Sequence, residues 1–106
     1  MTANIGELLQ TAQQLQQKLG QVQEELARKS VEGSAGGGMV VAVVNGRQQL
    51  LSLRIEPSVI DPQEVAMMQD LIVAAVNQAL TKAGELAREE MSKIAGGLPL
   101  KIPGLF

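Results

Sequence analysis

The first thirty residues carry an apolar repeat typical of a helix that packs against another helix. Apolar side chains recur at alternating steps of three and four, at Ile5, Leu8, Ala12, Leu15, Leu19, Val22 and Leu26. Asn4 can cap the helix start, and Glu7 can bond back to it. The repeat predicts a helix over residues 4–29. At about 1.5 Å per residue it would run roughly 37 Å, well beyond the radius of gyration of about 13 Å for a compact chain of this size.

Three segments with β-propensity follow, at residues 30–34, 39–45 and 47–56. A glycine-rich stretch at 34–38 separates the first two and is expected to be a plain loop. Asn45-Gly46 is the strongest short signal for a two-residue hairpin turn. Such a turn would pair Val44 with Arg47 and Val40 with Leu51. The three segments predict a small antiparallel meander sheet.

A second long helix is predicted over residues 62–95. Asp61 would be its N-cap and Pro62 its first residue, and Gly96-Gly97 would end it. Its first half is apolar nearly all round, and its second half narrows to a stripe matched to the first helix. Residues 96–106 form an apolar tail broken by Pro and Gly, expected to be extended, mobile or docked on a partner.

The predicted fold is therefore α+β, with a single α-β-β-β-α domain over residues 1–95. Its small antiparallel sheet is flanked by two long amphipathic helices. A monomer of this kind would leave apolar stripes exposed, so we expect a homodimer.

The amino-acid composition excludes several kinds of catalytic and metal site. The 106 residues contain no Cys and no His, which excludes thiolate zinc sites and Cys- or His-dependent nucleophilic catalysis. We expect no enzymatic activity, no cofactor, no metal site and no small-molecule substrate. No signal peptide is visible, and no apolar run could span a bilayer, so we expect a cytoplasmic protein without a membrane partner.

Nine basic and eleven acidic residues give a net charge of −2, which counts against a nucleic-acid-binding domain, although local patches matter more than the total. Helical spacing predicts surface ion pairs Glu24–Arg28, Glu25–Lys29, Glu85–Arg88 and Glu89–Lys93. The adjacent carboxylates Glu24-Glu25 and Glu89-Glu90 are expected to be solvated.

An ordered series of segments resembles the YbaB/EbfC family of bacterial nucleoid-associated proteins over essentially the whole chain. The segments are Thr11-Ala12-Gln13-Gln14-Leu15-Gln16-Gln17-Lys18, Val31-Glu32-Gly33 with Gly36-Gly37-Gly38, Asn45-Gly46, Ile55-Glu56-Pro57 with Asp61, Leu71-Ile72-Val73-Ala74-Ala75-Val76-Asn77 and Ile102-Pro103-Gly104-Leu105-Phe106. The resemblance implies a homodimer whose long helices project as arms, and double-stranded DNA binding with low sequence preference. It also implies no enzymatic activity, a nucleoid location, and a role in compacting or organising the chromosome and influencing gene expression.

Two functions remain open at this point. In the first, basic residues on the projecting helices contact DNA phosphates, and the candidates are Lys18, Arg28, Lys29, Lys82, Arg88 and Lys93. In the second, the protein is a dimeric adaptor that binds another protein through helical grooves and the apolar tail, without direct DNA binding.

Overall fold

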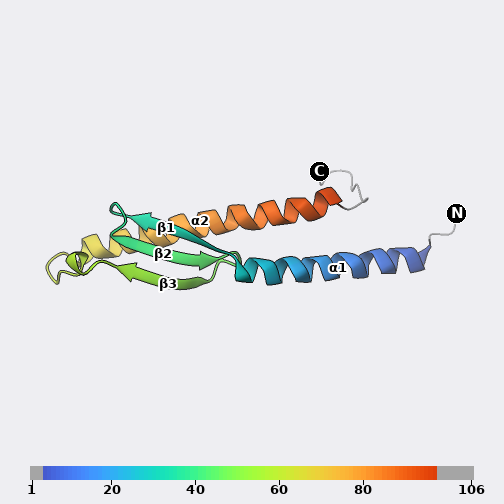
Figure 1. Ribbon diagram of the computed structural model, residues 1–106, viewed down its shortest axis with the longest axis horizontal. Coiled ribbons are helices and arrows are strands. Elements are labelled where there is room, and N and C mark those ends of the chain that lie inside the picture. The colour runs from blue at the N-terminus through green and yellow to red at the C-terminus, as the bar shows by residue number, and fades with distance from the viewer. Residues whose placement is uncertain (1–3, 98–106) are drawn as a thin grey trace.

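The computed structural model describes residues 4–97, which form an elongated molecule with both long helices leaving the same end of a small sheet (Figure 1). The elements are α1 (Ile5–Arg28), β1 (Ser30–Ala35), β2 (Val40–Asn45), β3 (Leu50–Ile55), a 3₁₀ turn (Pro57–Val59) and α2 (Val65–Gly97). The predicted α-β-β-β-α fold with an antiparallel sheet is confirmed. The radius of gyration is 20.2 Å and the extents are 74 × 25 × 17 Å, because the helices continue far past the sheet.

Helix α1 begins at the predicted cap. The Glu7 backbone N–H donates to Asn4 Oδ1 at 3.2 Å, which satisfies one of the unpaired N–H groups of the first turn. The helix ends at Arg28, where Lys29 turns to extended backbone and leads directly into β1. Of the residues in α1, Val22 and Leu26 at its sheet end are buried. The rest of the helix projects as an arm (Figure 1).

The sheet has the order β1-β2-β3, and α2 packs across β1 and β2. Val40, Ala42 and Val44 of the central strand point toward α2 and are fully buried with Val59. On the helix, Ala75, Ala79 and Ala83 meet them at four-residue spacing. These small side chains let α2 approach closely, and β1 meets it with Gly33, where a Cβ would overlap the Ala75 carbonyl oxygen and the Ala79 nitrogen.

The predicted register of the β2–β3 hairpin is wrong. Val44 pairs with Leu50 and Val40 with Ile55, and Leu51 is an extra residue at a bulge beside Val43/Val44. The reason is the bonding of Asn45, whose Oδ1 accepts the N–H groups of Arg47 and Gln49, each at 3.0 Å. Asn45 thus closes the base of a three-residue loop rather than occupying the centre of a turn, and Gln48 takes the positive φ of 63°. Strand β3 accordingly begins at Leu50 instead of residue 47.

The predicted start and end of α2 also differ from the structure. Asp61 accepts hydrogen bonds from the Gln63 N–H through Oδ1, at 3.0 Å, and from the Glu64 N–H through its carbonyl, at 2.9 Å. It therefore forms a turn before the helix rather than its N-cap, and α2 starts at Val65. The helix includes Gly96 and Gly97, which the sequence pattern places in the tail. The remaining tail, residues 98–106, lies outside the described residues.

Candidate nucleic-acid interface

Five of the six basic residues expected to meet DNA lie on the two arms or at their base, the sixth, Lys82, lies beside the sheet, and all six are exposed. Lys18 and Arg28 belong to α1, and Lys29 follows its last residue. Lys82, Arg88 and Lys93 belong to α2. The two helices lie side by side beyond the sheet (Figure 1), so these charges are spread along an elongated molecule.

One carboxylate links the two arms at their base. Glu90 Oε1 accepts a hydrogen bond from Lys29 Nζ at 2.7 Å and another from Lys93 Nζ at 3.4 Å. Glu90 is only 5% exposed, whereas the two lysines remain open to solvent. The hydrogen bond from Lys29 holds the pKa of Glu90 below its ordinary value against the opposing effect of desolvation. The same hydrogen bond raises the pKa of Lys29.

This pairing overturns two expectations from spacing. Across residues 4–97, none of the four predicted ion pairs is formed, and the acidic partner of both Lys29 and Lys93 is Glu90. Glu90 is buried, not solvated, while its neighbour Glu89 is exposed as expected. The reason is tertiary: Glu90 is on the side of α2 that meets the end of α1, where Lys29, 61 residues earlier in the chain, approaches it.

Lys82 lies against the sheet rather than out on the arms. Its Nζ donates to the backbone carbonyl of Glu32 in β1 at 2.9 Å. This bond neutralises no charge, and an ammonium group has three donors, so Lys82 can still bind a phosphate oxygen. Its position extends the basic surface from the arms to the outer strand β1.

Lys18 and Lys93 come together although they are 75 positions apart in the chain. Both line a hollow of about 230 Å³ between the arms, with Gln21, Val22, Glu25, Glu90 and Ile94. Lys29 and Lys93 thus share the Glu90 carboxylate, and Lys18 lines the same hollow as Lys93 and Glu90. Arg28 and Arg88 are exposed nearby on their own helices.

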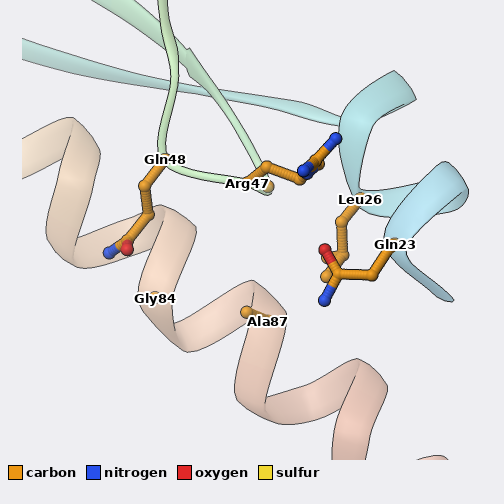
Figure 2. A pocket seen from close by; sticks show the side chains of 7 residues that line it. Gln23, Leu26, Arg47, Gln48, Gly84 and Ala87 are labelled. Carbon is orange, nitrogen blue, oxygen red and sulfur yellow. The ribbon is translucent and has the colours of Figure 1, made fainter. Parts of the chain in front are cut away.

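One further exposed basic residue, which was not among the sequence candidates, is Arg47 in the β2–β3 loop. It borders a hollow of about 490 Å³ between this loop and the two helices, with Gln23, Leu26, Gly46, Gln48, Gly84 and Ala87 (Figure 2). The Arg47 side chain reaches toward the base of α1, and that of Gln48 lies above α2 at Gly84 (Figure 2). A guanidinium can hydrogen-bond phosphate oxygens, so Arg47 is a further candidate for a phosphate contact. An arginine in a hairpin loop next to Asn45-Gly46 was the available signal.

Other kinds of site find no support in the described part of the chain. Among residues 4–97 no three or more acidic side chains gather where they could hold a metal ion. Neither described helix has an apolar stretch long enough to cross a membrane.

The structure is that of an α+β protein with two long helical arms that carry exposed basic residues. The model of the YbaB/EbfC DNA-binding family matches residues 1–98, and the chain belongs to this family.

Several relatives are named nucleoid-associated proteins. One from Syntrophobacter fumaroxidans is 58% identical over 101 residues, which is 92% of each chain. Another, from Thermoanaerobacter pseudethanolicus, is 52% identical over 97% of this chain and 91% of its own. The crystal structure of an uncharacterized protein from Helicobacter pylori shares the fold, with a TM-score of 0.76 over 91% of this chain and 100% of that one, at 23% identity.

Proposed function

We propose that the protein is a homodimeric nucleoid-associated protein that binds double-stranded DNA with low sequence preference and helps to compact or organise the chromosome, thereby influencing gene expression. The observation that carries the proposal is the exposure of all six candidate basic residues along the arms and the adjoining sheet of this family's fold. The names of the relatives point the same way. The place of action would be the nucleoid, in the cytoplasm.

The proposed contacts are to phosphate, because the arms carry lysines, arginines and glutamines but no aromatic side chain for base stacking. Glu90 offsets part of the charge of Lys29 and Lys93. The residues that contribute most should then be Lys18, Arg28, Lys82 and Arg88. With this modest number of contacts per protomer, we expect Kd values of about 10⁻⁴ to 10⁻⁶ M at physiological salt.

The homodimer is supported by apolar surface that one copy leaves uncovered. Strand β3 is an outer strand, and Leu50, Leu51 and Leu53 on it are exposed. Val73 of α2 is exposed as well. We propose that a second copy covers β3 and the side of α2 that exposes Val73, which would place two pairs of arms on one particle. Light scattering at micromolar concentration should give twice the chain mass of 11.2 kDa; a monomer would refute this assembly.

DNA binding is tested by fluorescence anisotropy of a labelled duplex in a salt titration, repeated with scrambled duplexes. We expect similar affinity for all sequences and a linear fall of log K with log salt. Changing Lys18, Arg28, Lys82 and Arg88 together to Gln should weaken binding to every duplex. It should also flatten the salt slope by about 0.9 for each phosphate that the variant no longer neutralises.

A matched pair of single variants controls for net charge. Arg88→Gln removes a charge from an arm, and Arg54→Gln removes one from β3, the strand that the second copy would cover, so light scattering must first show that this variant still forms the dimer. We expect the first to weaken binding and reduce the slope, and the second to change both much less. Unchanged affinity in the fourfold variant would refute the phosphate contacts. No binding at low salt would instead favour the protein-binding adaptor.

A further inference from the structure

The hollow at the β2–β3 loop differs in charge from the hollow between the arms. The hollow between the arms is lined by two lysines and two glutamates, so its charges offset one another. Among the described residues that line the hollow at the loop, Arg47 is the only charged one, and the polar side chains beside it are the amides of Gln23 and Gln48. Arg47 is exposed and belongs to none of the ion pairs formed within residues 4–97. Its positive charge is therefore available to an anion.

Hydrogen bonds hold the loop, and with it Arg47, against the end of α1. The Gly46 N–H donates to the carbonyl oxygens of Leu26 at 2.8 Å and of Lys29 at 3.0 Å. The buried Asn45 accepts the Arg47 N–H through Oδ1 at 3.0 Å. These bonds use the backbone of Gly46 and Arg47 and leave the guanidinium to a ligand. Because the loop is already fixed in place, little conformational entropy is lost when a ligand binds there.

Small residues of α2 keep the hollow open. Gly84 and Ala87 lie three residues apart on one side of the helix and line the hollow opposite the loop (Figure 2). A Cβ added at Gly84 would have Gln48 Nε2 as its nearest neighbour, at 3.6 Å, so this space is not filled by the packing. Gln48 and Gln23 lie on either side of it, one from the loop and one from α1 (Figure 2). A group that enters the hollow therefore meets two amides as well as the guanidinium.

We propose that this hollow binds one backbone phosphate of DNA, with Arg47 as the principal contact and the amides of Gln23 and Gln48 as further donors. This inference rests on the proposed DNA binding and adds a site to it at the base of the arms. The guanidinium fork matches two phosphate oxygens at once, and glutamine amides also bind phosphate without reading sequence. Arg28 and Lys29 lie at the same end of α1, so the hollow continues a basic surface. A duplex bound in this way crosses the junction of the arms and the sheet.

A free anion is a weaker candidate for the hollow than a duplex. The site offers one charge in an exposed position, where a single ion pair contributes little binding energy. A phosphate of a duplex that the arms already hold is different, because the other contacts keep it at a high effective concentration near the hollow.

Arg47→Gln tests the site in the salt-titrated anisotropy assay. The loss of one phosphate contact should flatten the salt slope by about 0.9 for each occupied hollow, which corresponds to an affinity about eightfold lower at about 0.1 M salt. Arg47→Lys keeps the charge and should restore the slope. If the wild type binds and Arg47→Gln matches it in affinity and slope, the phosphate site is wrong while the proposed DNA binding stands. A wild type that binds no duplex at low salt would refute the DNA binding itself.

A second variant tests the hollow rather than the charge. Ala87→Leu fills the hollow from α2 with a good helix former and no change of charge, and should also weaken binding and flatten the slope. Its control is Ala66→Leu, an exposed position in the first turn of α2 at the end away from the arms (Figure 1), which should bind as the wild type does. Circular dichroism and light scattering verify that each variant keeps its fold and assembly.

The combination of the two changes decides whether they act at one site. Arg47→Gln with Ala87→Leu should bind no more weakly than the weaker single variant, because both changes remove the same contact. Losses that add up in the double variant, or normal binding by Ala87→Leu, would overturn the proposal that the phosphate enters this hollow.

Discussion

Replacing Gly33 with Ala tests the closest approach between the sheet and its helix. Gly33 of β1 faces the backbone of α2, where an added Cβ would overlap the carbonyl oxygen of Ala75 and the nitrogen of Ala79 and lie 3.0 Å from the Ala79 Cα. All three atoms are backbone, so no side-chain rotation can relieve the overlap. Strand β1 and helix α2 would have to separate, which would loosen the packing of Val31 and Ala35 on the core.

Overpacking a core typically costs 1–3 kcal/mol, so we expect a loss of about 3 kcal/mol for this rigid contact. For a domain of this size, that corresponds to a fall in Tm of roughly 12 °C or more. Urea and thermal unfolding followed by circular dichroism would measure it, since the chain has no Trp or Tyr to report by fluorescence. Protein concentration must be held constant, because association also stabilises the fold.

The matched control is Gly20→Ala in α1, where a Cβ would meet nothing within 4 Å. This change should stabilise the protein by up to about 1 kcal/mol, because Ala is the better helix former. If Gly33→Ala lowers the stability and Gly20→Ala raises it, the packing around each glycine, and not the Gly-to-Ala change itself, decides the effect on stability. A Gly33→Ala protein as stable as the wild type would refute the close approach of β1 to α2.

Three further predictions concern the junction of the arms. Gly46→Ala should reduce the free energy of unfolding by about 1–3 kcal/mol and so lower Tm. The added Cβ would lie 2.8 Å from the Leu26 carbonyl oxygen and 2.9 Å from the Leu26 Cβ. An unchanged Tm would contradict this contact. Glu90→Gln should destabilise the protein at neutral pH yet tighten DNA binding, since Lys29 and Lys93 lose their shared carboxylate; anisotropy and unfolding on the same sample measure both. Because the pKa of Glu90 is lowered by folding, its contribution should be complete above the unfolded glutamate pKa of about 4.3 and vanish as pH falls through the lower folded value. Because the pKa of Lys29 is raised, its contribution should persist until pH rises above about 10.4 and be lost beyond that; unfolding of wild type and Glu90→Gln across pH checks both limits.

Local signals in the sequence predicted the elements better than their boundaries. The apolar repeat and Asn4 correctly predicted α1 and its N-cap, and the valines of residues 39–44 correctly predicted the central strand. The hairpin register and the start of α2 were missed for one shared reason. In each case a side chain with turn propensity, Asn45 or Asp61, bonds the backbone two residues ahead and so moves the next element later in the chain. Such bonds compete with the standard turn and cap, and residue identity alone does not decide between them.

For the candidate site, too, the sequence determined some features and the tertiary structure determined the others. The sequence by itself determined which residues carry positive charge and that they lie on helices with long apolar stripes, because charge and periodicity are local properties. Only the tertiary structure decided that Lys29 and Lys93 share Glu90, that Lys82 rests on β1, and that Arg47 stands at the base of the arms. These relations join segments up to 61 residues apart. They depend on how far α1 and α2 extend beside one another, which is set by packing at the sheet and not by either helix alone.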